Sequence, residues 1–80
     1  MPYITPERRE PLRQSRDANT PGELNFLLTL EIKAYVERRG LCYQTINDVL
    51  GALEGATREF YRRVAEPYED AKIRDNGDVY

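Results

Sequence analysis

The sequence has no histidine, no tryptophan, and only one cysteine in its 80 residues. One cysteine excludes an internal disulfide, and the absence of histidine removes the commonest general base and metal ligand. The remaining carboxylates suit Mg²⁺ or Ca²⁺ better than zinc, but they form no recognisable ligand pattern. We therefore expect no cofactor and no metal. We interpret Cys42, in an apolar setting, as a buried side chain in a reducing cytoplasm.

The sequence also has no long apolar run and no excess of basic residues. Nothing approaches the ~20 apolar residues of a membrane span, and the first residues do not resemble a secretion signal. We therefore expect a cytoplasmic protein. The net charge is -2. An acidic balance provides no electrostatic footprint for a phosphate backbone, so we do not expect nucleic acid as a partner.

Catalytic patterns are missing as well. There is no Ser/His pair and no phosphate-binding loop, and the only serine is Ser15. Paired acids such as Glu69 with Asp70 could exchange protons, but solvated surface carboxylates explain them as well. We therefore expect a protein that is not an enzyme.

The chain contains clear helix signals after a polar start. Residues 1–19 contain Pro2, Pro6 and Pro11, and predict an arm with a helical turn or two. Thr20 followed by proline, glycine and Glu23 is typical of a capped helix start. Apolar positions at helical spacing then predict a helix over 21–39.

A second helix is predicted over 46–66. Thr45 and Asp48 resemble a capping pair, and the apolar seam has the spacing of a coiled coil. Its members are Ile46, Val49, Leu53, Ala56 and Phe60. Pro67 is expected to bend or end this helix, before a short helix or turn near 68–74.

These elements predict an all-α fold, with an arm over 1–19 and one helical domain over 20–80. A short connection favours an antiparallel hairpin of the two long helices. Two helices cannot bury all of their apolar positions against each other. We therefore expect a homo-oligomer, in which the chain is its own partner.

Small residues interrupt the second helix. Each glycine in a helix costs roughly 0.5–1 kcal/mol relative to alanine, so close approach of another helix is a natural explanation. A ligand against bare backbone is the alternative. The predicted close-packing set is Gly51, Ala52, Leu53, Gly55 and Ala56.

A group of arginines and tyrosines follows on the same helix. Arg58 and Arg62 are like charges four residues apart, an arrangement that an anion between them would relieve. Arginine binds phosphate bidentately and tyrosine stacks on bases. The predicted ligand-binding set is Arg58, Arg62, Arg63, Tyr61 and Tyr68, with Gln44 and Asn47 as second choices. Salt bridges to nearby glutamates are the alternative.

Residues 41–56, LCYQTINDVLGALEGA, resemble a family of short proteins of unknown function from bacteriophages, prophages and bacteria. The resemblance continues through EFYRRV, PYED and the ending NGDVY, and includes the opening MPYI and GELN. It departs at residues 7–19, where relatives have a more apolar helical segment. The resemblance implies a phage-type setting, hence a host bacterial cytoplasm, and no established activity.

The residues and the resemblance together predict a non-enzymatic oligomeric binding protein of phage type. Its expected role is to sequester a small anionic, nucleotide-derived signal of host immunity. The alternative is an adaptor or inhibitor that binds a host or phage protein through apolar residues such as Leu24, Leu28 and Leu53. A third possibility is a virion or nucleic-acid accessory protein that uses the basic arm.

Overall fold

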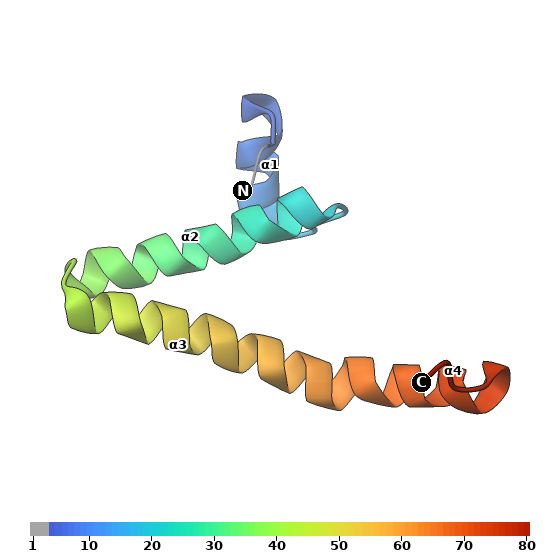
Figure 1. The fold of residues 1–80 in the computed structure, drawn as a ribbon. Coiled ribbons are helices and arrows are strands. Elements are labelled where there is room, and N and C mark those ends of the chain that lie inside the picture. Colours follow the sequence, from blue (N-terminus) through green and yellow to red (C-terminus); the bar gives the residue numbers. More distant parts are fainter. Residues whose placement is uncertain (1–3) are drawn as a thin grey trace. The chain divides into compact units, whose positions relative to one another are not determined.

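The computed structural model describes residues 4–80, all of it helix and connecting segments with no strand in that range (Figure 1). The prediction of an all-α fold is confirmed. The first three residues of the predicted arm lie outside the described part. The elements are α1 (Pro6–Ser15), α2 (Pro21–Arg39), α3 (Tyr43–Phe60), the π-helical turn η1 (Tyr61–Ala65) and α4 (Glu66–Asn76).

Helix α2 has the predicted bounds. The Thr20 hydroxyl accepts a hydrogen bond from the backbone N–H of Glu23 at 3.1 Å, and proline occupies the first turn. At the other end, Gly40 has a φ of 83°, and its N–H donates to the carbonyl of Val36 at 2.8 Å. Because a positive φ is free of strain only for glycine, the helix ends where the sequence indicates.

Helix α1 is longer than the one or two turns that the sequence predicts, because it continues through Pro11. The side chain of Leu12, the next residue, is completely buried. Arg8 reinforces this packing by donating from Nε to Glu23 Oε2 on α2 at 3.0 Å. Packing against α2 therefore outweighs the helix-breaking tendency of the proline.

The contact between α1 and α2 also fixes the charge state of Glu23, whose side chain is 14% exposed. The hydrogen bond from Arg8 lowers the pKa of Glu23, and the backbone N–H of Asn19, 2.9 Å from Glu23 Oε1, lowers it further. The same bond raises the pKa of Arg8. Glu23 is thus held as an anion at the junction of the two helices.

The predicted second helix, 46–66, is wrong at both ends. It begins at Tyr43, so Thr45 lies inside the first turn, where it is buried and its hydroxyl lies 3.4 Å from Cys42 Sγ. Cys42 itself is exposed, which corrects the expectation of a buried thiol. At the other end, the helical path continues past Pro67 to Asn76.

The turn η1 explains how the helix passes Pro67. Proline cannot donate to the carbonyl four residues earlier, and its ring clashes with that carbonyl. Immediately before it, the N–H of Glu66 donates to the carbonyl of Tyr61, five residues back instead of four. The extra residue in this turn makes room for the proline ring, so the chain stays helical.

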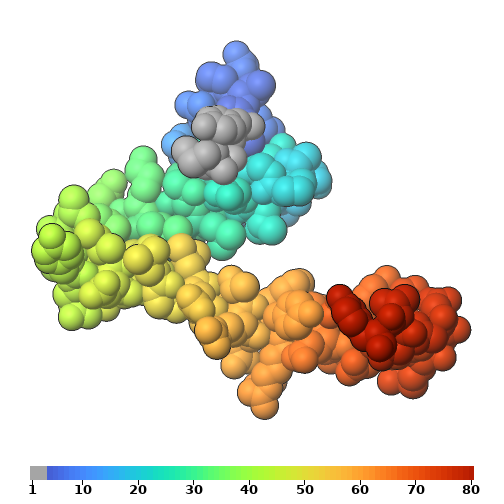
Figure 2. Space-filling view, in the orientation of Figure 1, coloured from blue at the N-terminus to red at the C-terminus, as the bar shows by residue number. Residues whose placement is uncertain are grey.

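Contacts group the chain into two units, residues 1–45 and 46–80. The predicted division at residue 19 differs from this one, because α1 packs on α2 inside the first unit (Figure 2). The buried side chains of the described residues, Leu12, Phe26 and Thr45, all belong to the first unit. None of residues 46–80 is buried.

Within the second unit, the chain turns back after α4 (Figure 1). Gly77 has a φ of 84°, and its N–H donates to the carbonyl of Ile73 at 2.8 Å. The Asp78 carboxylate accepts a hydrogen bond from the backbone N–H of Tyr80 at 2.9 Å. From residue 4 onward, no helix combines the length and the apolar character that a membrane crossing requires.

Candidate functional site

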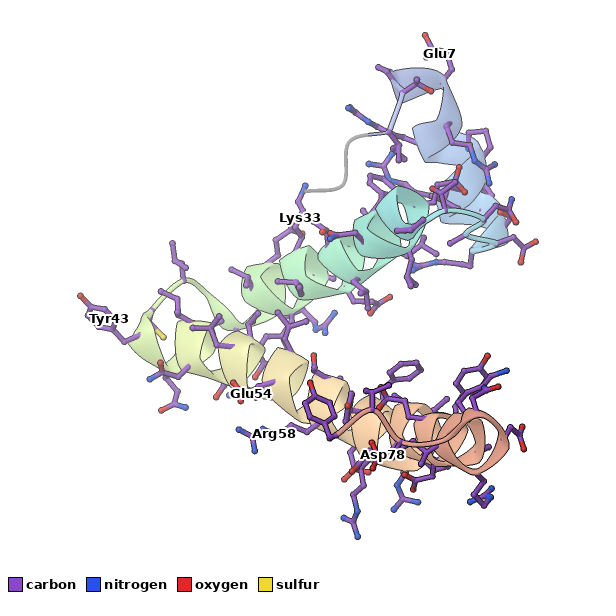
Figure 3. All side chains as sticks on the ribbon, turned by 45° about the vertical axis from the view of Figure 1, so that its right-hand side comes forward. Glu7, Lys33, Tyr43, Glu54, Arg58 and Asp78 are labelled. Atoms are coloured by element: carbon purple, nitrogen blue, oxygen red, sulfur yellow. The ribbon has the colours of Figure 1, made fainter. Side chains whose placement is uncertain are left out.

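The predicted arginine cluster is divided among separate ion pairs. Arg58 lies 2.8 Å from Glu54, two residues labelled in Figure 3. Arg63 lies 2.7 Å from Glu59, and all four side chains are largely exposed. Arg62 forms no ion pair or hydrogen bond with the rest of residues 4–80. For Arg58 and Arg63 this is the salt-bridge arrangement that the sequence left as the alternative.

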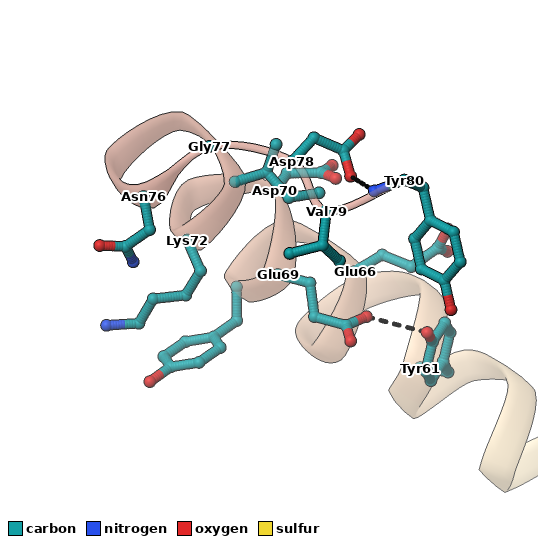
Figure 4. A pocket seen from close by; sticks show the side chains of 12 residues that line it. Tyr61, Glu66, Glu69, Asp70, Lys72, Asn76, Gly77, Asp78, Val79 and Tyr80 are labelled. Atoms are coloured by element: carbon teal, nitrogen blue, oxygen red, sulfur yellow. Dashed lines mark hydrogen bonds between the residues drawn. The ribbon is translucent and has the colours of Figure 1, made fainter.

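The predicted tyrosines lie close together, but their neighbours are a glutamate and a lysine rather than the predicted arginines. Tyr61 donates from its hydroxyl to Glu69 Oε1 at 2.8 Å, and this bond raises the pKa of Tyr61. The ammonium of Lys72 lies 5.4 Å from the ring centre of Tyr68, within cation–π range. Both tyrosines line one hollow of about 470 Å³ beside α4, which we name the tyrosine hollow (Figure 4).

The tyrosine hollow is acidic. One lysine lines it, against four carboxylates, those of Glu66, Glu69, Asp70 and Asp78. None of the predicted arginines is among its lining residues. Negative lining repels a phosphate group, so this hollow does not suit the anionic ligand for which the tyrosines were singled out. The hollow depends on the turn at Gly77, after which residues 78–80 join its lining.

Gln44 and Asn47 lie exposed in the first turns of α3. Asn47 and Arg58 are eleven residues apart on the same helix, which corresponds to about 16 Å along its axis. The second-choice residues therefore do not extend the arginine cluster. Their role in ligand binding stays a prediction.

The predicted close-packing residues do not share a face of α3. At 3.6 residues per turn, Gly51 and Gly55 each lie about 160° around the axis from Leu53, with Ala52 and Ala56 between. A Cβ atom added at either glycine would meet nothing within 4 Å. The glycines thus lie on an open polar face of α3, and their role at an interface stays a prediction.

The opposite face of α3 carries an exposed apolar row, which we name the α3 stripe. It consists of Ile46, Leu50, Leu53 and Phe60, which are 40%, 61%, 38% and 63% exposed. The separations of four, three and seven residues place these side chains on one side of the helix. The seam predicted from the sequence shares Ile46, Leu53 and Phe60 with this stripe. Val49, another member of that seam, also lies on this side of the helix, about 40° around the axis from Leu53, but it is partly buried rather than exposed.

Across residues 4–80, no three or more aspartate, glutamate or cysteine side chains gather closely enough to hold an ion. The charged side chains are instead paired locally or solvated.

The fold and these surfaces define a small all-helical protein with a polar face, an apolar stripe and locally paired charges. The chain belongs to the family described as Domain of unknown function (DUF6899), whose sequence model covers residues 1–79. No curated protein and no solved structure matches the chain. Membership of an uncharacterised family agrees with the resemblance found from the sequence, while the phage setting stays a prediction.

Proposed function

We propose that this protein is a non-enzymatic binding protein that acts as a homo-oligomer, in which two copies pair their α3 stripes. The observation that carries the proposal is that none of residues 46–80 is buried, although they include the four apolar side chains of the stripe. An isolated helix is marginally stable in water and normally depends on packing of an apolar face. A second copy supplies that packing.

The pattern of the stripe supports a second copy as the occupant. Spacings of four and three are those of coiled coils, in which like helices interlock.

The proposal includes the predicted antiparallel hairpin of α2 and α3. The connection between α2 and α3 is only residues 40–42, and such short connections usually join antiparallel neighbours. The oligomer would then be built from hairpins, each presenting one α3 stripe to its partner.

The geometry favours a protein surface over a nucleotide as the partner of residues 58–68. Arg58 and Arg63 are already neutralised by glutamates, and the tyrosine hollow is acidic. Sequestration of a nucleotide-derived immune signal at these residues stays a prediction. A role as an adaptor or inhibitor of a host or phage protein in the cytoplasm fits the exposed apolar residues better.

Sedimentation and light scattering test the proposal directly. Leu50→Glu and Phe60→Glu place charges in the α3 stripe, and burial of each side chain contributes about 1.5–3 kcal/mol. The double variant should weaken association at least ~100-fold and yield monomers. Asn47→Glu adds the same charge outside the stripe and should leave the oligomer intact. A wild-type protein that remains monomeric at high concentration, or a control that dissociates equally, would contradict the proposal.

A further inference from the structure

A second hollow lies between α1 and α2 in the first unit, with a volume of about 240 Å³. Its charged lining residues are all basic, namely Arg9, Arg13 and Lys33, and no carboxylate lines it. Its charge is therefore opposite in sign to that of the tyrosine hollow. We name it the cationic hollow.

The three cations come from two helices. Arg9 and Arg13 lie four residues apart and so share one face of α1, where like charges are mildly destabilising. Lys33 extends from α2, on the side where α1 lies (Figure 3). Packing of α1 on α2 thus gathers three positive charges around one hollow, a concentration that an anion would relieve.

Two of these cations lack a carboxylate partner within residues 4–80. Arg9 makes only a 3.5 Å hydrogen bond to the carbonyl of Ile4, and Lys33 makes no ion pair with the described residues. Arg13 has a glutamate at 3.3 Å, but both side chains of that pair are about half exposed. The hollow therefore keeps donors that are available to a ligand.

Aromatic packing orders one of the donors. The guanidinium carbon of Arg13 lies 5.5 Å from the ring centre of Phe26, whose side chain is 8% exposed. A guanidinium stacked on a buried ring keeps its N–H groups directed along its edge, which lowers the entropy lost when an oxyanion binds. Thr29, also in the lining, already donates its hydroxyl proton to the carbonyl of Asn25 at 2.9 Å, so the cations provide the recognition.

We propose that the cationic hollow binds the phosphate group of a small phosphomonoester. Arg9 and Arg13 donate to the phosphate oxygens, and Lys33 supplies further positive charge. The volume of about 240 Å³ lies just below the ~300–1,000 Å³ of pockets for drug-sized ligands. It therefore suits a phosphate group with part of its substituent. The proposal does not depend on α3 or on oligomerisation.

A titration followed by NMR, with inorganic phosphate, AMP and adenosine as separate probes at constant ionic strength, tests the binding. The amide and side-chain signals of Arg9, Arg13 and Lys33 should shift saturably with phosphate and with AMP, at a Kd of about 1 mM or tighter. Adenosine should cause no shift. No saturable response to either phosphate compound, or an equal response to adenosine, overturns the proposal.

Matched variants separate a site from diffuse attraction. Arg9→Gln and Lys33→Gln each remove one charge from the hollow and should weaken AMP binding about fivefold, at the upper end for exposed ion pairs. Arg38→Gln removes one charge from α2 at an exposed position that does not line the hollow, and it should leave affinity unchanged. Equal weakening by Arg38→Gln overturns the proposal. Far-ultraviolet circular dichroism checks that each variant is folded.

An oligonucleotide provides the last comparison. A short single-stranded DNA should bind no more tightly than AMP, because three cations at one hollow do not follow a backbone. Much tighter binding to the DNA, with a steep loss of affinity on addition of salt, would assign these cations to nucleic acid and overturn the proposal.

Discussion

Replacement of the two α3 glycines gives the sharpest test of how that helix is used. A Cβ atom at Gly51 or Gly55 would meet nothing within 4 Å, and both lie on the polar face. Alanine is more stable than glycine in a helix by roughly 0.5–1 kcal/mol. Gly51→Ala and Gly55→Ala should therefore together raise the free energy of unfolding by about 1–2 kcal/mol.

Thermal unfolding followed by circular dichroism measures the effect. For a chain of this size, 1 kcal/mol corresponds to about 4–8 °C in Tm, so the double variant should gain about 4–16 °C. Gly77→Ala is the matched control with the opposite sign. Gly77 has a φ of 84°, where any Cβ is strained, so that alanine should lower the Tm.

A lower Tm for the double variant would refute this reasoning. It would mean that another helix approaches the glycine face closely enough for two methyl groups to obstruct it, as the sequence alone suggests. Sedimentation of the same variant then identifies the source. Dissociation would place the contact between copies, and unchanged mass would place it within one chain.

Three further predictions concern hydrogen bonds and the π turn. Glu23→Gln should make the free energy of unfolding depend less on pH in the acid range. The lowered pKa of Glu23 gives stability that is present above its unfolded pKa of about 4.3 and is lost as pH falls through the folded value. Acid unfolding followed by circular dichroism measures this, and an unchanged pH dependence would contradict it. Pro67→Ala should stabilise the helix, by less than the ~3 kcal/mol of an uncompensated proline, and a lower Tm would count against the account of η1. Tyr61→Phe should remove a phenol that titrates above the ordinary tyrosine pKa near 10, because its hydrogen bond to the Glu69 carboxylate disfavours the phenolate. Absorbance titration should lose amplitude in the high-pH part of the profile, and a loss centred at the ordinary pKa would contradict the account.

The sequence predicted the helix ends that are set by interactions within one turn of the chain. Both ends of α2 follow from Thr20 at its start and Gly40 at its end, whose side chain and φ act within one turn. Two prolines misled the prediction, for different reasons. Pro11 is overruled by burial of Leu12 as α1 packs on the next helix, and Pro67 by a shift of hydrogen bonding in the preceding turn.

The candidate sites were less predictable, because they depend on which charges meet. Arg58 and Arg63 were singled out as ligands, yet each has a glutamate four residues earlier that captures it. Arg9 and Arg13 are not among the predicted ligands, since the surplus of positive charge over residues 1–19 is small. Only the packing of α1 on α2 places them beside Lys33, and that packing was not predicted.

The single residue inserted at η1 also separates the surfaces of the second unit. One extra residue in a turn delays every following side chain by about 100° around the axis. A helix packed along the row from Ile46 to Phe60 would therefore meet a different side of this helix beyond residue 65. Because η1 turns the following side chains to another side of the helix, residues after it can acquire contacts of their own without disturbing the contacts of the residues before it.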